Sequence, residues 1–335
     1  MNTTFILQKD VVDDLFIRED EFKNFIKFIK KNFCNYTLIT DFTDETEFRT
    51  RAAENPILEI LLDKFSKIKY VIDLKSQFEN GKILELSSKR SIVLSNIDDT
   101  GCQNYLNNHG LLFFNLSNLN KWDFYNEVIF SKSIKVTRDV NYPINLKFTA
   151  FTDFTKYLKY CKTVIIFDKY LFGNKTNQRI TKNLYKMIEE ILLVNKKMEI
   201  MIISEFKEDE ISIAYDSILD HLKIKGFNEF RLNLIHHSKA MYPRKFEGLH
   251  SRFILSNYIH IRSNDSFNFF KDNGEINNLV DIDIKFNLTT ENSYSYRTDL
   301  DAVKTYVDKI KNEPNCGNKS LRITFYKDKM NYLMN

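Results

Sequence analysis

Glycine and proline are scarce in this sequence, with 8 glycines and 4 prolines among 335 residues. Flexible and stiff linkers are rich in one or the other, so the composition argues against a long linker between folded parts. No internal repeat and no low-complexity tract is present. The motifs GxGxxG, GxxxxGKS/T, GxSxG and HExxH are also missing. Their absence removes the usual support for dinucleotide oxidoreductases, P-loop NTPases, α/β-hydrolases and zinc proteases.

Cysteine is rare and scattered, with no C-x-x-C pair and no histidine cluster at zinc spacing. The four cysteines are Cys34, Cys102, Cys161 and Cys316. This pattern favours reduced, mostly buried thiols in a cytoplasm, and we expect these cysteines to bind no metal or cofactor. The opening residues MNTTFILQKDVVDD lack a basic segment followed by an apolar core, so we expect no signal peptide. No apolar run is long enough to span a bilayer.

What the sequence does contain is typical of a folded protein. Apolar residues make up 43% and charged residues 28%, which suits a chain with a sizeable core. The length of 335 residues makes two domains the default expectation. A net charge of +4, from 49 basic and 45 acidic residues, neither demands nor excludes a polyanionic partner.

Residues 1–150 alternate between strand and helix patterns. TTFIL, YTLIT, SIVLS and LLFFN are typical of strands, and the apolar spacing from Val12 to Ile29 predicts one amphipathic helix. Asn55 and Pro56 supply an N-cap and a first-turn proline, while Asp98 and Gly110 bracket another helix. A further helix is expected through Trp122 and Ile129. Such alternation favours a Rossmann-like, mostly parallel sheet, and the sequence assigns this domain no role.

Residues 151–335 form the second expected domain, with a boundary near Ala150. TVIIFDKYLF, MEIMIIS, FRLNLIHHS, FILS and YIHIRS are expected strands, and helices separate the first three. VDIDIKFNL alternates strictly, so one face should meet water. A helix near Thr298–Lys311 and a last strand, LRITFY, complete an α/β domain with a mixed sheet flanked by helices.

One stretch, LHSRFILSN from Leu249 to Asn257, carries the strongest functional signal. It falls on the pattern H-x-K-x4-D of the phospholipase D-like superfamily, and residues 162–270 resemble one repeat of that fold. VIIFDKYLF is similar to the family's opening strand, which often ends in Asp-x-Tyr. SNDSF, which contains Ser266, falls where the family has a small phosphate-binding loop.

The resemblance implies a metal-independent site for a phosphate ester. By resemblance, His250 would attack phosphorus, Arg252 would neutralise the phosphate oxygens and Asn257 would stand where an aspartate supports the histidine. The family uses two motif copies and this chain has one, so the resemblance implies a homodimer. No cofactor is implied.

The departures from the motif favour binding over cleavage. Arg252 replaces a lysine but still offers a phosphate two donors. Asn257 replaces the aspartate and has no negative charge for an imidazolium. Asn264 and Asp265 stand where glycine and a small residue are expected, and Asp265 would repel phosphate. A simpler interpretation stays open, in which His250 and Arg252 only edge a sheet on a shared face.

Two further groups of residues are candidates. His236 and His237 are adjacent at a strand end, so their side chains point to opposite faces and at most one can look into a site. Lys239, Arg244 and Lys245 precede His250 and, if their loop caps its site, would make the rim basic, although an ordinary solvated loop explains them better.

Carboxylates in the first domain follow the ends of expected strands, where ligands of parallel sheets bind. The weak metal candidates are Asp10, Asp41 and Asp98, with Asp13, Asp14 and Asp99 nearby. FILQKDVVDDLF resembles the opening of PIN-type nucleases, but Gln8 stands where that family has its first metal-binding aspartate. Helix N-capping explains most of these acids without a metal.

The sequence leaves three functions open. We expect first a cytoplasmic phospholipase D-like module that binds nucleic acid or another phosphate-bearing partner and is catalytically weak or inactive. His250 and Arg252 would contact phosphate, supported by Asn257, Ser266, Arg244 and Lys245. The alternatives are a metal-independent phosphodiesterase or nuclease with His250 as nucleophile, and a protein-interaction scaffold with a vestigial pocket. A role in defence against phage is suggested by analogy alone.

Overall fold

The structure is a computed structural model of the full chain. It describes residues 3–31, 36–65, 67–119, 128, 133–138, 145–172, 176–206, 211–237, 252–277, 280–312, 323–325 and 330–334. Two compact units divide the chain. The first unit comprises Met1–Lys132 and Asn287–Ser293, and the second comprises Ser133–Phe286 and Tyr294–Asn335. The second unit begins before the expected boundary near Ala150, because two strands that precede Ala150 pair into its sheet.

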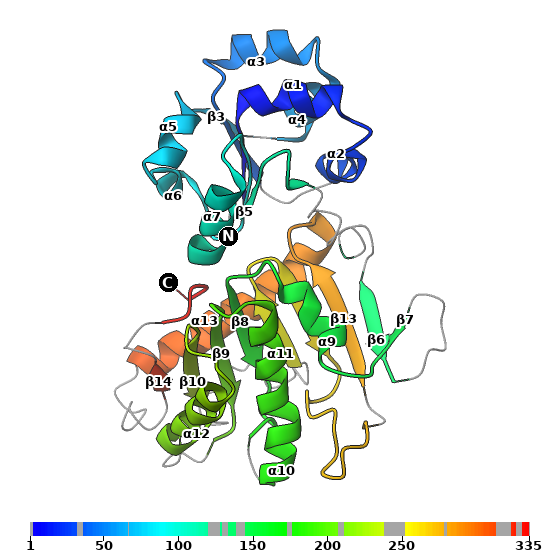
Figure 1. Ribbon diagram of the computed structural model, residues 1–335, viewed down its shortest axis with the longest axis vertical. Helices are drawn as coiled ribbons and strands as arrows, with labels where there is room; N and C mark the ends of the chain where they lie inside the picture. The colour runs from blue at the N-terminus through cyan, green and yellow to red at the C-terminus, as the bar shows by residue number, and fades with distance from the viewer. Residues whose placement is uncertain are drawn as a thin grey trace. The chain divides into compact units, whose positions relative to one another are not determined.

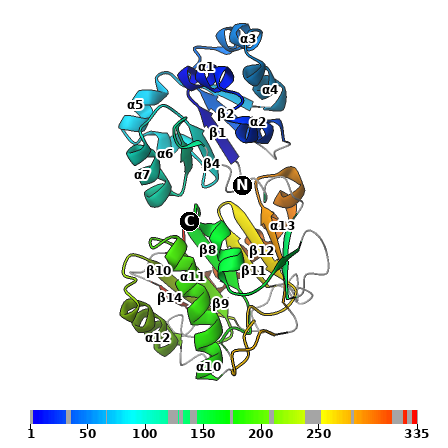
Figure 2. The ribbon, with the colours of Figure 1, turned by 45° about the vertical axis from the view of Figure 1, so that its right-hand side comes forward.

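The first unit is built on a five-stranded sheet in which every neighbouring pair is parallel (Figure 2). The strand order is β3-β2-β1-β4-β5. The strands are β1 (Thr3–Leu7), β2 (Tyr36–Thr40), β3 (Lys67–Tyr70), β4 (Ser91–Leu94) and β5 (Leu112–Phe114). The order reverses between β1 and β4, as in doubly wound folds, so the predicted Rossmann-like parallel sheet is confirmed.

Helices cover both faces of this sheet. They are α1 (Lys9–Ile17), α2 (Lys23–Lys30), α3 (Glu45–Ala52), α4 (Pro56–Lys64), α5 (Leu74–Glu79), α6 (Ile83–Leu86) and α7 (Asp99–His109). On one face, Ile6 and Val93 pack against Phe78 of α5 and Cys102 of α7. On the other face, the ring of Phe5 lies 6.2 Å from that of Phe25 in α2. Burial on both faces explains why β1, β4 and β5 are buried at every position, whereas the edge strand β3 has two exposed lysines.

The helix ends follow the expected capping chemistry. The Oδ1 atom of Asn55 accepts hydrogen bonds from the amides of Ile57 and Leu58 at the start of α4. Asp98 Oδ1 accepts from the Gly101 amide at 2.7 Å and caps α7, which ends at Gly110 with φ +67°. Both predicted capped helices are confirmed.

The single helix expected from Val12 to Ile29 is wrong, because the structure has α1 and α2 instead. The break falls on the charged run from Arg18 to Glu21, where Arg18 forms an exposed ion pair with Glu21. The apolar spacing continues across the break, so periodicity alone did not show the change of direction. The helix expected through Trp122 and Ile129 falls on residues outside those the structure describes.

The second unit is built on a mixed nine-stranded sheet of order β14-β10-β9-β8-β11-β12-β13-β6-β7 (Figure 1). Its strands are β6 (Ile134–Thr137), β7 (Asn145–Lys147), β8 (Thr163–Phe167), β9 (Glu199–Ser204), β10 (Arg231–His236), β11 (Arg252–Ser256), β12 (Ile259–Ser263), β13 (Asp281–Phe286) and β14 (Ile323–Phe325). Strands β8, β9 and β10 run parallel, and β11 and β12 form an antiparallel hairpin beside β8. The predicted mixed sheet is confirmed.

Helices flank this sheet on both faces (Figure 1). They are α9 (Thr152–Thr155), α10 (Asn177–Ile180), α11 (Lys186–Val194), α12 (Ile211–Ile224) and α13 (Thr290–Asn312), with a π-helical turn at Thr181–Tyr185 that joins α10 to α11. Tyr296, Val303 and Tyr306 of α13 pack on Phe167 and Phe253 of the sheet. Helix α13 is longer than the predicted Thr298–Lys311 because it starts at Thr290.

Two general expectations can be compared with the described part of the chain. Cys102 and Cys161 are buried free thiols, and Cys34 and Cys316 lie outside the described residues. Across the described ranges, no helix combines the length and apolar character needed to cross a membrane.

Candidate functional site

The carboxyl ends of β8, β9 and β10 lie together at one edge of the second sheet, here called the carboxyl edge. Because β11 runs antiparallel to β8 and pairs Phe253 with Phe167, its first residue, Arg252, also lies at this edge. Asp168 follows β8, and Ser204 and His236 end β9 and β10. Ligands of open α/β sheets commonly bind beyond the carboxyl ends of the strands, so this edge is the candidate site.

Asp168, at the carboxyl edge, is fully buried and accepts three hydrogen bonds. Its Oδ1 accepts a hydrogen bond from the Tyr170 amide at 2.9 Å. Its Oδ2 accepts from the Ser266 hydroxyl and the Phe267 amide, both at 2.7 Å. Burial raises the pKa of Asp168 to about 6, against these hydrogen bonds and the charge of Arg252, which lower it. The carboxylate therefore ties the loop after β12 to the end of β8.

Beside Asp168 lies a pocket of about 320 Å³, here called the edge pocket. Its lining residues are Tyr170, Arg179, Arg252, Asp265, Ser266, Asn268 and Asn277. The guanidinium of Arg252 lies 5.0 Å from the centre of the Tyr170 ring, and its Nη1 donates to the carbonyl oxygen of Asn264 at 3.4 Å. Ring contact and hydrogen bond together hold this cation at the pocket wall.

Arg179 enters the pocket from α10, immediately before the π-helical turn. The loop that forms the opposite wall is fastened to this helix by Asn183, whose Nδ2 donates to the Phe270 carbonyl at 2.8 Å and whose Oδ1 accepts from the Phe270 amide at 2.7 Å. Thr176 adds a hydrogen bond to Asp272 at 3.1 Å. Arg179 Nε is buried and has no hydrogen-bond partner among the described residues. The edge pocket is thus lined by two arginines, Arg179 and Arg252, and the hydrogen bonds of Asn183 hold the segments around it together.

Asn268 completes the polar lining. Its Nδ2 donates to the Tyr170 carbonyl oxygen at 2.6 Å and to the Ser266 hydroxyl oxygen at 2.9 Å. The residue is 3% exposed, and within the described chain its Oδ1 is a buried acceptor without a hydrogen bond. An unsatisfied buried polar atom is uncommon in folded proteins and points to a missing partner.

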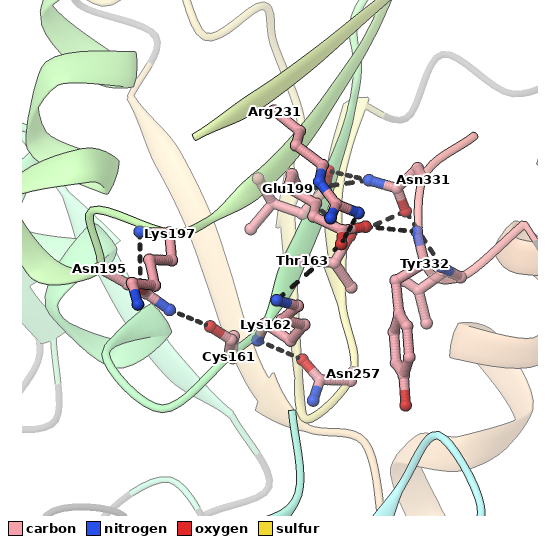
Figure 3. Close-up of polar contacts among 12 residues, drawn as sticks. Cys161, Lys162, Thr163, Asn195, Lys197, Glu199, Arg231, Asn257, Asn331 and Tyr332 are labelled. Atoms are coloured by element: carbon pink, nitrogen blue, oxygen red, sulfur yellow. Dashed lines mark hydrogen bonds and ion pairs between the residues drawn. The ribbon is translucent and has the colours of Figure 1, made fainter. Parts of the chain in front are cut away.

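The structure brings two of the predicted site residues together and separates a third. Arg252 and Ser266 both line the edge pocket. Asn257 lies at the other end of β11, about 16 Å away at roughly 3.3 Å per residue of strand. There it is fully buried, and its Oδ1 accepts from the Lys162 amide at 3.1 Å, which fixes the start of β8 (Figure 3). Asn257 is therefore outside the pocket that contains Arg252.

The remaining four predicted residues precede β11 in the sequence. His250, Arg244, Lys245 and Lys239 lie outside the residues that the structure describes. They belong to the segment that joins β10 to β11, and both of its described ends, His237 and Arg252, are at the carboxyl edge. Their expected contacts with phosphate stay predictions.

The opposite, amino edge of the same sheet contains a second group of buried charges (Figure 3). Glu199 accepts hydrogen bonds from Arg231 Nη1 at 3.0 Å and from the Tyr332 amide at 2.8 Å, and its Oε1 lies 3.9 Å from Lys162 Nζ. Burial lowers the pKa of Lys162 and, with the charge of Glu199, raises the pKa of Tyr332 to about 12. Asn331 bridges Thr163 and the carbonyl oxygen of Glu199. This network fastens the carboxyl-terminal segment to the sheet.

The adjacent histidines both have structural contacts. His236 Nδ1 accepts from the Phe206 amide at 3.2 Å. The ring of His237 lies 5.6 Å from that of Phe167 and 6.0 Å from that of Tyr306, and burial lowers its pKa to about 3. A neutral His237 packed against α13 acts as part of the core.

Two of the three candidate metal ligands of the first unit, Asp41 and Asp98, accept hydrogen bonds from main-chain amides. Asp41 Oδ1 accepts from the Lys9 amide at 2.6 Å, and burial raises its pKa. Asp98 caps α7, and Asp10 lies in the first turn of α1. Gln8 Oε1 accepts from the Asn96 amide at 3.1 Å and bridges the ends of β1 and β4, where the strand order reverses. Among the described residues, no three His, Cys, Asp or Glu side chains gather as a metal site would need.

Sequence reasoning missed Arg179 and Asn268. Arg179 sits on a helix with ordinary polar neighbours, and its role follows only from the loop that Asn183 fastens to it. Asn268 follows SNDSF directly, so extending that loop by one residue would have included it. A scan against protein-family models and a search of curated proteins found no match for the chain.

Proposed function

We propose that the second unit is a phosphate-binding module whose ligand is nucleic acid, with Arg252 and Arg179 as its anion contacts. The observation that carries the proposal is the convergence of these two guanidinium groups on one polar pocket of about 320 Å³. Arginine offers paired, directional donors that match phosphate oxygens. The volume falls at the lower end of small-ligand sites, which suits one nucleotide unit at a time.

The charges around the pocket support an anionic ligand. Two arginines face the half-exposed carboxylate of Asp265, one oxygen of which accepts from the Ser266 amide. Asp168 lies behind the wall, outside the residues that line the pocket, and burial raises its pKa to about 6. The balance at the pocket surface is therefore positive. Lys239, Arg244, Lys245 and His250 lie outside the described residues; if their segment caps the pocket, they would add to this charge.

The geometry favours a site that binds a phosphate ester without cleaving it rapidly. In the phospholipase D-like pattern an acid stabilises the protonated histidine, but Asn257 is neutral and holds the start of β8. The guanidinium group of Arg252 has hydrogen-bond donors but no acceptor, so it cannot replace the missing acid or base. By resemblance, the protein would be a cytoplasmic homodimer that presents two such pockets.

The salt dependence of oligonucleotide binding tests the proposal. We expect a fluorescent single-stranded oligonucleotide to bind in EDTA, with an affinity that falls as salt rises because phosphate contacts release counterions. Arg252→Ala should weaken binding about tenfold. It should also reduce the slope of log affinity against log salt concentration by about 1, the value expected for one lost phosphate contact. Lys223→Ala, on the exposed face of α12, is the charge-matched control and should change neither.

Two results would overturn or redirect the proposal. Salt-independent binding, or equal affinities of wild type and Arg252→Ala, would remove the edge pocket as the phosphate site. Cleavage in EDTA that is lost in His250→Ala would replace the proposal by the nuclease alternative. Cleavage that needs Mn²⁺ and is lost in Asp98→Ala would indicate a metal-dependent nuclease site in the first unit instead.

A further inference from the structure

The edge pocket contains acceptors as well as cations, and a phosphodiester group, which has no hydrogen-bond donor, would not use the acceptors. Arg179 and Arg252 offer donors, whereas Asp265 and the Oδ1 atom of Asn268 can only accept. A phosphodiester without a neighbouring hydroxyl would pair with the arginines and leave the acceptors without donors. The lining therefore suits a ligand that has an anion and a hydrogen-bond donor close together.

The orientation of the Asn268 amide is set by its neighbours. The Ser266 hydroxyl donates its hydrogen to Asp168, so toward Asn268 its oxygen can only accept. The Tyr170 carbonyl can also only accept. Both partners therefore require the NH₂ group of Asn268, and a flipped amide would place oxygen against oxygen at both contacts. The free acceptor is Oδ1, and within the described chain no donor reaches it.

We infer that the edge pocket takes a ribose phosphate, with the phosphate on Arg179 and Arg252 and the sugar 2′-hydroxyl donating to Asn268 Oδ1. This inference rests on the proposed function and specifies its ligand as RNA rather than DNA. In RNA the 2′-hydroxyl lies on the carbon next to the one that bears the 3′-phosphate, which matches a cation and an acceptor in one small pocket. Asp265 is a second acceptor for the same sugar, as carboxylates are for ribose hydroxyls in dinucleotide sites.

Three oligonucleotides of one sequence test the inference: RNA, DNA and 2′-fluoro RNA. The 2′-fluoro form keeps an RNA-like sugar but has no donor at the 2′ position. We expect RNA to bind the wild-type protein about tenfold more tightly than either of the others, because a buried polar group left unpaired weakens binding. Equal binding of all three would overturn the inference and leave the proposed function standing. No measurable binding of any of them would remove both.

Two variants locate the effect. Asn268→Ala should bring RNA binding down to the DNA level and leave DNA binding unchanged. Asp265→Asn keeps an oxygen for the Ser266 amide and should therefore fold normally; it removes the negative charge, so it should tighten DNA binding and narrow the RNA preference. Circular dichroism and thermal unfolding establish that each variant is folded.

Two outcomes would contradict the assignment to this pocket. An RNA preference that survives in both variants would place the hydroxyl contact elsewhere. Binding of 2′-fluoro RNA as tight as that of RNA would show that the protein reads the shape of the sugar and not its hydrogen-bond donor.

Discussion

At the amino edge of the second sheet, Glu199 is held by Arg231, Lys162 and the Tyr332 main chain, and Asn331 ties the adjoining main chain to the same network. At the carboxyl edge, Asp168 is equally buried, but the wall beside it contains Arg179 Nε and Asn268 Oδ1, which have no partners among the described residues. Both edges combine a buried carboxylate with cations. They differ in whether the chain itself completes the hydrogen bonds, and this separates a structural network from a binding site.

The largest expected effect is on stability and comes from the amino edge. Glu199→Ala should lower the free energy of unfolding by about 3–5 kcal/mol, because it leaves the buried cation of Lys162 without its carboxylate. Urea denaturation measures the loss. Glu229→Ala is the matched control, since Glu229 forms an exposed ion pair with Lys197 and should cost at most about 1 kcal/mol. A Glu199 variant as stable as this control would show that the network does not fasten the edge.

A second effect concerns His237, which faces α13 at the carboxyl edge. Its pKa is lowered to about 3 in the folded protein, so the unfolded chain takes up its proton first as pH falls. The neutral His237 side chain therefore stabilises the folded protein fully above the unfolded pKa of about 6.5. This contribution is lost as the pH falls from about 6.5 to about 3. From pH 7 to pH 4 this loss is about 3 kcal/mol. His237→Phe keeps a ring in place and should flatten the profile of unfolding free energy against pH; parallel profiles would contradict the packing role.

Asn257 allows a direct comparison of the two ends of one strand. Asn257→Ala should cost about 1–3 kcal/mol of stability, since the buried Lys162 amide loses its acceptor, and should leave oligonucleotide binding unchanged. Arg252→Ala, at the other end of β11, should do the reverse. Loss of binding in folded Asn257→Ala would return Asn257 to the functional role that its place in the motif predicts.

The smallest effect is expected for the link between Asp168 and the pocket wall. Ser266→Ala removes one hydrogen bond from Asp168 and one acceptor from Asn268, so we expect about 1 kcal/mol lower stability at pH 7. Loss of the hydroxyl donor should also raise the pKa of Asp168 further, which carboxyl-detected NMR titration can follow. An unchanged Asp168 titration would show that the hydroxyl is not bonded to it.

The sequence predicted elements better than contacts. Apolar runs located most of the strands but not the short β6 and β7. Asn55 and Asp98 marked helix starts, because capping depends on a few neighbouring residues. The charged run from Arg18 to Glu21 interrupts a continuous apolar period, so the break between α1 and α2 was missed. The pattern that joined Arg252 to Asn257 described a spacing along one strand. That spacing places the two residues at opposite edges of the sheet, and only the register with β8 makes this clear.

The pocket depended on contacts between distant segments. Arg179 and Asn268 line the same pocket, and Asn183, in a π-helical turn, connects their segments by hydrogen bonds to the amide and carbonyl groups of Phe270. Nothing in the local sequence around Asn183 distinguishes it from an exposed helix residue, although it is fully buried. Asp168 was visible as the acid after a buried strand, but the three donors that it accepts from come from two separate loops.

The most direct test of the account is a crystal structure of the full chain with a short oligoribonucleotide at saturating concentration. The account predicts a phosphate within hydrogen-bond distance of both Arg179 and Arg252, at the carboxyl edge. A complex in which the oligonucleotide binds elsewhere while the edge pocket contains no part of it would contradict the account.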